Sequence, residues 1–260
     1  MLNVVFPALC ESRSPAFYLA AEEYLARNSG EDFFMLWRVG PSVIFGRNQD
    51  MEAEVNLPFC RREGIGVFRR KSGGGCVYAD KGNLMISSVT SGNDKPFLFS
   101  RFISALALFL RSRGYDAWPS GRNDILVSGR KVSGSAFYST GDRNIMHATL
   151  LCDTDIGIMV RAITPPAEKL RTKGIASVRQ RVANLSGFPG SGTGGMEQAL
   201  TDFFCDGMKI LTEADMARIE ALEQEYLDEK FIAGRRRARM EDKILHDGTG
   251  NGNIEENMSV

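Results

Sequence analysis

The order of strand-like and helix-like patterns constrains the fold of this chain more than any other feature. Short runs rich in β-branched and aromatic residues occur at 2–6, 33–39, 42–46, 66–70, 83–90, 124–138 and 147–156. Helical spacing of apolar residues marks 15–28, 97–113, 196–210 and 213–230. Because the two patterns do not alternate in strict βαβ order, the sequence predicts an α+β domain with a mixed β-sheet rather than a doubly wound fold.

Turn-forming residues divide these runs. Gly40-Pro41 predicts a hairpin or a tight connection between the second and third strand runs, and Ser128-Gly129 predicts a turn within 124–138. After Leu185 the composition changes to SGFPGSGTGG, which is typical of a flexible linker. We expect one domain over residues 1–230, followed by a flexible tail over 231–260 that contains the basic run RRRAR.

Composition excludes several classes of protein. Of the 260 residues, 43% are hydrophobic and 25% are charged, which is ordinary for a globular protein with a core. The formal net charge is zero, so bulk charge favours neither a nucleic acid nor an anionic membrane as partner. No apolar run reaches the length of about 18 residues that spans a bilayer, and the N-terminus lacks the basic start of a signal peptide.

Cysteine and histidine usage indicates a reducing compartment. The five cysteines form an odd, dispersed set, which favours free thiols over a disulfide framework or a zinc cage. The two histidines, His147 and His246, are too far apart for an HExxH zinc motif. We therefore expect a cytoplasmic protein.

The segment RRKSGGGCVYADKGN, residues 69–83, is the first with chemical information. Three consecutive glycines cost backbone entropy, which the close approach of a ligand would explain. Their N–H groups can surround a phosphate or carboxylate, and Arg69 and Arg70 add positive charge beside them. The segment matches neither GxGxxG nor the P-loop, so it does not indicate a Rossmann or Walker site. The alternative is a glycine-rich hairpin that binds nothing.

A second segment, GRNDILVSGRKVSGSAFY over 121–138, places polar residues around an apolar strand. Asn123 and Asp124 open it, and Asp124 is of the type that binds Mg²⁺ on a nucleotide phosphate. Lys131 lies among small residues, where a ligand has room to approach, and its ammonium could bridge a carboxylate and an α-phosphate. The alternative is an exposed strand lysine with a structural role.

Two further segments leave both a functional and a structural interpretation open. His147 opens the run HATLL and is either a ligand-facing group or a satisfied core histidine. Residues 173–185, KGIASVRQRVANL, either close over a ligand as a lid or form a basic surface strip. Cys152 lies inside the apolar run TLLCDTD and is expected in the core.

Taken together, these ordered segments resemble the lipoate-protein ligase A family, in the wider group that includes biotin ligases and octanoyltransferases. The resemblance runs from about Phe6 to Leu185 and rests on LWRVGPSVIFGRNQD, RRKSGGGCVYADKGN, SGRNDILVSGRKVSGSAF, HATLL and KGIASVRQRVANL. It implies a biotin/lipoyl ligase-like catalytic domain, in which a mixed β-sheet with flanking helices forms a tunnel for the acyl-adenylate.

The resemblance assigns roles to particular positions. It implies that Lys131 is the essential catalytic lysine and that Asp124 holds Mg²⁺. The residues implied in binding lipoate or the adenylate are Arg70, Ser72, Gly73, Gly74, Gly75, Cys76, Val77, Tyr78, Asn83, Asn123, Lys131, Ser135 and His147. Among these, Arg70 would contact the nucleotide phosphates or the carboxylate, and His147 would lie near the acyl pocket.

The implied reaction has two steps. A lipoate carboxylate attacks the α-phosphate of ATP in the presence of Mg²⁺ and gives lipoyl-AMP; the amine of an acceptor lysine then attacks the acyl carbonyl and releases AMP. Lys131 would stabilise the charge that develops on the phosphoryl and carbonyl oxygens. The implied partners are lipoyl-acceptor domains of 2-oxoacid dehydrogenase complexes or the glycine cleavage H protein.

The sequence departs from the family's pattern in three places. Ala79 stands where a histidine is usual before Asp80, and Ala148 stands where HGTLL is usual. The small accessory domain that follows the catalytic domain in full-length ligases is not expected, because YLDEKFIAGRRRARM stands at its usual start. We therefore expect a separate accessory subunit, transfer from preformed lipoyl-AMP only, or a protein that has lost the first step.

Other functions of the same fold remain open at this stage. Octanoyltransferases use a cysteine nucleophile, but the corresponding stretches here, GYDAWPSGRND and RAITPPAEKL, contain no cysteine, so a thioester mechanism is not expected. The alternatives are a non-catalytic module that binds an acyl-adenylate, and a ligase or transferase of the same fold that acts on octanoate or biotin.

Overall fold

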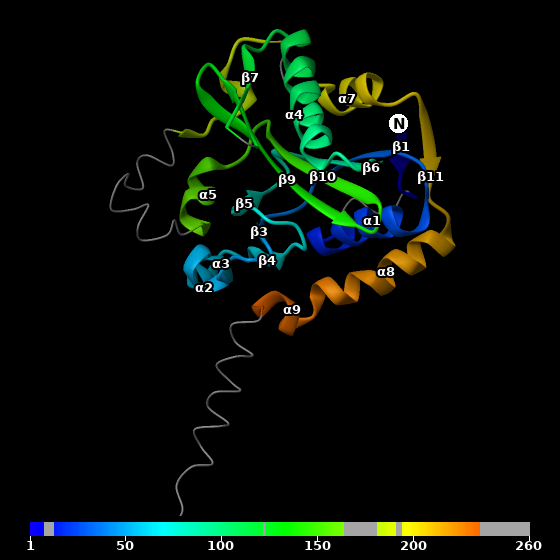
Figure 1. The fold of residues 1–260 in the computed structure, drawn as a ribbon. Helices are drawn as coiled ribbons and strands as arrows, with labels where there is room; N and C mark the ends of the chain where they lie inside the picture. Colours follow the sequence, from blue (N-terminus) through cyan, green and yellow to red (C-terminus); the bar gives the residue numbers. More distant parts are fainter. Residues whose placement is uncertain (8–12, 122, 164–180, 191–193, 235–260) are drawn as a thin grey trace, which may run out of the picture.

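The β-prone runs pair into two sheets in the computed structural model, which describes residues 1–7, 13–121, 123–163, 181–190 and 194–234 (Figure 1). The large sheet has the order β11-β1-β2-β6-β10-β9-β8-β7. Its strands are β1 Leu2–Val5, β2 Phe33–Trp37, β6 Asn83–Ser91, β7 Ala117–Ser120, β8 Asp124–Val127, β9 Arg130–Thr140, β10 Arg143–Leu151 and β11 Gly207–Ile210. Because β1 runs parallel to β2 and β11 while the other pairs are antiparallel, the sheet is mixed, and the predicted α+β class is confirmed.

Helices cover both faces of the large sheet. Helix α1, Pro15–Asn28, packs on one face, where Phe17 and Leu25 join a core that includes Trp37, Met85 and Ile145. The opposite face is covered by α4, Lys95–Ser112, and α7, Met196–Phe204 (Figure 1). Pro15 occupies the first turn of α1, where its missing N–H costs nothing, and the predicted bounds of this helix are confirmed.

A small sheet lies beside the large one and carries the glycine segment. Its order is β4-β3-β5, with β3 Ser42–Phe45, β4 Gly66–Arg69 and β5 Cys76–Ala79. The short helices around it are α2 Met51–Glu54, α3 Leu57–Arg62 and α5 Ile156–Ala162. They bury a third core in which Val43, Phe45, Phe59 and Tyr78 take part.

Two expectations for the first half of the chain need correction. Of the two alternatives predicted between 33–39 and 42–46, the hairpin is wrong, because β2 belongs to the large sheet and β3 to the small one, whereas the short connection is present, with four residues between the strands. The segment between 66–70 and 83–90 is not only a glycine loop, since β5 pairs antiparallel with β3. Gly40-Pro41 therefore carries the chain from one sheet to the other.

The C-terminal half also differs in part from the prediction. The helical pattern over 196–210 ends with α7 at Phe204, and 207–210 is strand β11, whose four residues pair with β1. The second pattern forms α8, Glu213–Leu227, and α9, Glu229–Ala233, so helix extends to 233 within the segment expected as tail. The rest of that segment, 235–260, lies outside the described residues. A single 3₁₀ turn, Leu185–Gly187, opens the predicted linker.

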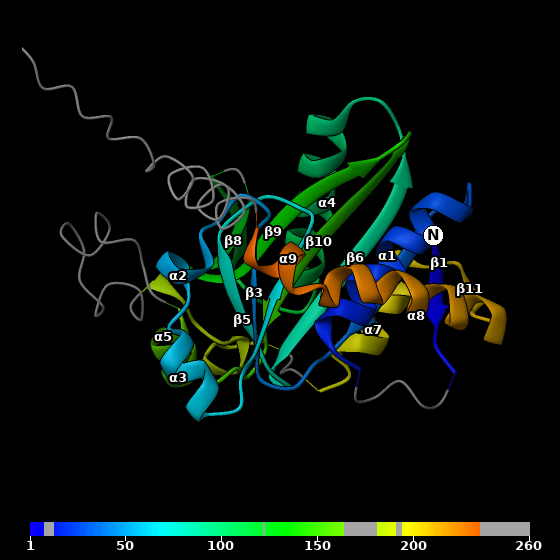
Figure 2. The ribbon, with the colours of Figure 1, turned by 90° about the horizontal axis from the view of Figure 1, so that it is seen from below.

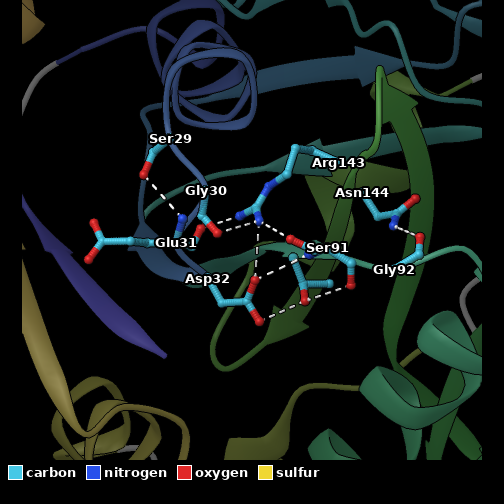
Figure 3. Close-up of polar contacts among 9 residues, drawn as sticks. Ser29, Gly30, Glu31, Asp32, Ser91, Gly92, Arg143 and Asn144 are labelled. Carbon is cyan, nitrogen blue, oxygen red and sulfur yellow. Dashed lines mark hydrogen bonds and ion pairs between the residues drawn. The ribbon is translucent and has the colours of Figure 1, made fainter.

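Arg143, at the start of β10, joins the ends of three central strands (Figure 3). Its guanidinium donates to the carbonyls of Gly30 and Glu31 and to the hydroxyl of Ser91, and pairs with Asp32 at 3.5 Å. The side chain is buried, so these partners replace the water that its charge would otherwise bind. Arg143 thus fixes the α1–β2 connection against β6 and β10.

No helix among the described residues is long and apolar enough to cross a membrane.

Candidate active site

The glycine loop between β4 and β5 is held in place by Arg70. This guanidinium is 5% exposed and donates to the carbonyls of Ile44, Gly73 and Gly75 and to the hydroxyl of Ser72. Burial lowers the pKa of Arg70 to about 10, while Cys76 and Glu22 act to raise it, so the side chain remains a cation at neutral pH. Most of its N–H groups are engaged by the loop itself.

The structure requires glycine at one position of the loop, Gly74, and at one position beside it, Gly46. Gly74 has a φ of +87°, in the left-handed region that favours glycine. A Cβ on Gly46, at the end of β3, would lie 2.1 Å from the carbonyl oxygen of Gly74. The amide of Arg47 donates to the carbonyl of Ser72 at 2.9 Å, so the segment after β3 supports the loop from outside.

A cavity of about 110 Å³ lies between this loop and the large sheet. Its walls are mostly apolar, with Leu19, Trp37, Ile44, Met85 and Ala148 among them. Sequence-predicted residues also line it: Arg70, Gly74, Gly75, Cys76, Val77, Asn123, Lys131, Ser135 and His147. The glycine loop and Lys131, 56 positions apart at their nearest, therefore face one space.

A second cavity, of about 220 Å³, adjoins the first and shares five lining residues with it: Cys76, Val77, Lys131, Gly134 and Thr149. Tyr78 and Asn83 line this second space, as do Arg181 and Val182. Asn83 is fully buried and donates to the carbonyl of Tyr78, while its Oδ1 accepts no hydrogen bond from the described residues. The wall of the second cavity therefore contains one buried acceptor without a partner among the described residues.

Lys131 stands at the boundary of the two cavities. Its Nζ lies 2.7 Å from Oδ1 of Asp124, across the β8–β9 pair. The register shifts between Ile125 and Leu126, so that Leu126 pairs with Lys131. The two side chains are about one third and one quarter exposed, which leaves both accessible to a ligand.

A chain of buried polar groups runs behind the first cavity. Nε2 of His147 lies 2.7 Å from the hydroxyl of Ser72, and Nδ1 lies 3.1 Å from Oε2 of Glu22. Glu22 in turn accepts from Ser87, which accepts from the indole N–H of Trp37 at 2.9 Å. His147 is thus both a satisfied core histidine and a residue of the cavity wall, and the two interpretations of its sequence context are not exclusive.

Three of the predicted site residues do not line either cavity. Ser72 is buried and hydrogen-bonded to His147, and the carbonyl of Gly73 accepts from Arg70. Asp124 pairs with Lys131, which lines both cavities. Of the arginine- and lysine-rich segment 173–185, residues 173–180 lie outside the described residues, and the two interpretations of this segment, a lid or a basic surface strip, fall largely on them.

The cysteines behave as the sequence predicts. The four described cysteines are free, and Cys152 is buried in the core. Cys76 lines both cavities, and burial raises its pKa to about 12, which keeps the thiol protonated at neutral pH. Neither thiol has the character of a nucleophile.

Sequence reasoning missed Glu22 and Trp37. Glu22 lies three residues after Leu19 on the buried face of α1. A carboxylate at an apolar position of a helix could have indicated that Glu22 is buried and hydrogen-bonded. Trp37 was included in an apolar strand, and nothing in that run marked it as a cavity wall. Two of the positions that depart from the family's pattern are alanines in described parts of the structure. Ala148 lines the first cavity and so affects its shape, whereas Ala79 is packed in the core.

Comparisons with known proteins identify the family. A family model described as the lipoyl protein ligase A/B catalytic domain matches residues 14–204. The chain is 42% identical over 177 residues to the lipoate-protein ligase LplJ of Bacillus subtilis and 39% identical to the lipoate–protein ligase 1 of Staphylococcus aureus. Each alignment covers 67% of this chain and 54% of the relative, so the chain spans about half the length of the curated relatives it matches.

Solved structures of similar fold agree with this match. A bi-partite lipoate protein ligase of Thermoplasma acidophilum, studied with its E2 lipoyl domain, gives a TM-score of 0.79 at 28% identity, with 90% of this chain and 95% of that chain covered. A lipoate-protein ligase A bound with ATP gives 0.77 at 26% identity, with 90% and 98% covered. This chain belongs to the family of lipoyl protein ligase A/B catalytic domains.

Proposed function

We propose that this protein attaches lipoate to a lysine of an acceptor domain through lipoyl-AMP. In the first step the lipoate carboxylate attacks the α-phosphate of ATP, forms a carboxylate–phosphate bond and releases pyrophosphate. In the second step the acceptor amine attacks the acyl carbonyl, the acyl–phosphate bond breaks, and AMP leaves. Both steps build negative charge on oxygens at one point, so a fixed cation there accelerates both.

The observation that carries the proposal is the position of Lys131 in the shared wall of two adjoining cavities. An acid in the apolar first cavity and a nucleotide in the second would meet at its ammonium. The apolar walls suit a hydrocarbon chain, and the free acceptor on Asn83 suits the N–H of a base. In this arrangement Lys131 is the catalytic residue, and Ser135 and Asn123 lie in the cavity beside it.

The binding residues proposed from the sequence divide between these two cavities. Arg70 and the glycine loop form one wall of the first, where the loop's N–H groups would meet the carboxylate and the α-phosphate. Tyr78 and Asn83 lie in the second, where the base would bind. Arg70 would act mainly by fixing the loop, because its donors are engaged there.

Mg²⁺ fits this site as an ion bound mainly by substrate. Among the described residues, no three His, Cys, Asp or Glu side chains are grouped so that they could hold a metal ion. Mg²⁺ commonly takes one or two protein carboxylates together with phosphate oxygens and water, and Asp124 is a partly exposed carboxylate next to Lys131. Asp124 would hold the ion, whose charge would offset that of the phosphates.

Relatives support the choice of substrates and partner. Two curated relatives carry the name lipoate-protein ligase, one neighbour binds ATP, and another was studied with an E2 lipoyl domain. We therefore propose lipoyl-acceptor domains, those of 2-oxoacid dehydrogenase complexes or the glycine cleavage H protein, as partners. The bi-partite neighbour makes a separate accessory subunit a second proposed partner, required for the first step.

The test is to incubate the full chain with an apo acceptor domain, once with lipoate, ATP and Mg²⁺ and once with synthetic lipoyl-AMP. Because the first step is proposed to need the accessory subunit, we expect a mass increase of the acceptor with lipoyl-AMP. A mass increase with lipoate, ATP and Mg²⁺ as well would show that this chain is a complete ligase. Modification with lipoyl-AMP alone assigns only the second step to this chain. Tight binding of lipoyl-AMP without modification would contradict the proposal and identify a binding module. The same assay with octanoate and biotin in place of lipoate determines the acid.

A further inference from the structure

Four consecutive residues ahead of the triple glycine contact two different parts of the molecule. Arg70 and Ser72 point inward, to the loop carbonyls and to His147. Arg69 and Lys71 point the other way, to the C-terminal helices α8 and α9. Strand β4 ends at Arg69 and the chain bends at Lys71 and Ser72. Because the four residues are consecutive, any shift of Arg69 and Lys71 also moves Arg70 and Ser72.

Lys71 is bound by α8 and α1 together. Its Nζ lies 2.8 Å from Oε2 of Glu23 on α1 and 2.9 Å from Oε2 of Glu225 on α8, and it stands 4.7 Å from the ring centre of Tyr226. Tyr226 also donates to Glu23 at 2.7 Å. Burial alone would lower the pKa of Lys71, but the hydrogen bonds to Glu23 and Glu225 raise it overall, so the ammonium stays charged at neutral pH.

Arg69 forms a second connection, from α9. Its guanidinium donates to the carbonyls of Ile232 and Ala233 at the end of α9, and also to those of Arg47 and Gln49 after β3. That same segment supports the glycine loop, because the amide of Arg47 donates to the carbonyl of Ser72. Helix α9 is thereby joined to the loop through one buried arginine.

The path of the C-terminal helices agrees with these contacts. Helix α8 runs along α1 and contacts β4, and α9 ends beside β4. Figure 2 shows α8 and α9 passing from the edge of the large sheet across α1 toward the small sheet. Both helices therefore lie behind the strand that leads into the glycine loop.

We infer that α8 and α9 position the glycine loop for its ligand, and that Lys71 and Arg69 are the positioning residues. The inference builds on the proposed ligase function, since the loop in question is the one that would bind the acyl-adenylate. It assigns to residues 213–233 a role in substrate affinity, beyond their contribution to the core. A change at α8 or α9 would alter binding at a cavity that neither helix lines.

The test compares Lys71→Met with Glu220→Gln in the full chain. Lys71→Met keeps most of the side chain and removes its charge. Glu220 lies on α8, as Glu225 does, but it pairs with Arg13, ahead of α1, and not with Lys71. It therefore serves as the matched control. Lys71→Arg retains the charge, so its amide exchange at Arg47 and its KM for lipoyl-AMP should be close to the wild-type values.

The first measurement is hydrogen exchange at the amide of Arg47 in the protein without ligand. This amide reports directly on the glycine loop because Ser72 accepts its hydrogen bond. We expect exchange about 10-fold faster in Lys71→Met and unchanged in Glu220→Gln. Equal exchange in the two variants would overturn the inference, and this result does not depend on whether the protein is a ligase.

The second measurement is transfer from lipoyl-AMP to an acceptor domain. A loosened loop should raise KM for lipoyl-AMP about 10-fold and leave kcat within about twofold. A fall in kcat with KM unchanged would contradict a positioning role. If Lys71→Met does not fold, Glu225→Gln replaces it, because Glu225 is largely exposed, and its effect on both measurements must exceed that of Glu220→Gln.

Discussion

The hydroxyl of Ser72 lies 2.7 Å from Nε2 of His147, so the glycine loop is joined directly to strand β10 of the large sheet. Glu22 holds the other ring nitrogen of this histidine at 3.1 Å from inside α1. Three elements that are far apart in the sequence therefore meet in one buried polar chain. The shape of the first cavity depends on it, because His147 is part of the cavity wall.

Replacement of Glu22 tests this chain. Glu22→Leu leaves Nδ1 of His147 and the hydroxyl of Ser87 without their acceptor, and each unsatisfied buried group costs about 1–3 kcal/mol. We expect a lower free energy of unfolding in urea, whereas Glu22→Gln, which can still bond both neighbours, should lose less. Equal losses in the two variants would show that the hydrogen bonds do not matter.

Packing of the glycine loop is tested at Gly46. A Cβ at this position would meet the carbonyl of Gly74 at 2.1 Å, so Gly46→Ala should displace the loop at a cost of about 1–3 kcal/mol and raise KM for the acid. Gly40→Ala is the control, because nothing lies within 4 Å of a Cβ there. Similar unfolding curves for both variants would argue against the close approach.

The contacts of Arg143 predict a loss of stability without a change in ligand affinity. A lysine cannot reach two carbonyls, a hydroxyl and a carboxylate at once, so Arg143→Lys should lower the free energy of unfolding by about 1–3 kcal/mol. The exposed Arg62, which pairs with its neighbour Glu63 at 3.3 Å and lies over the ring of Phe59, gives the control Arg62→Lys, expected within about 0.5 kcal/mol of wild type. A shift in KM for Arg143→Lys would contradict a purely structural role.

Asp215, in the capping box of α8, predicts a dependence of stability on acid pH. Hydrogen bonds from Tyr24 and from the amide and hydroxyl of Thr212 lower the pKa of Asp215 to about 2. Because the folded-state pKa is below the ordinary value of 3.8, the stabilisation is complete above that value and is lost as pH falls toward 2. Urea midpoints measured at neutral pH and near pH 2 should fall less in Asp215→Asn than in the wild type; an equal fall would contradict this role.

The sequence predicted those parts of the fold whose pattern is local. Helix α1 has a proline at its start and regular apolar spacing, and the turn at Ser128-Gly129 is where it was expected, with Ser128 itself at positive φ. Strand β11 was missed because its four residues, Gly207–Ile210, gain a partner only from β1 at the other end of the chain. Pairing over such a separation leaves no mark in a local pattern.

The residues of the candidate site could likewise be predicted only where the signal lies in the local sequence. The glycines and Lys131 were recognisable from residue type and neighbours, and Gly74, Gly75 and Lys131 line the first cavity. The roles of Arg69 and Lys71 were not recognisable, because they depend on α8 and α9, more than 150 positions later. Arg70 was expected to contact a ligand, and it does line the first cavity. The sequence did not indicate that most of its donors bind the loop, since a buried guanidinium must satisfy them within the protein.

Lys131 provides the most direct test of the proposed catalysis. The rate of lipoyl transfer from synthetic lipoyl-AMP to an apo acceptor domain should fall on the order of 100-fold or more in Lys131→Ala, because a charge that stabilises the transition state is removed. Lys209→Ala, on the strand at the far edge of the same sheet, should retain the wild-type rate. A wild-type rate in Lys131→Ala would contradict the central role of this ammonium.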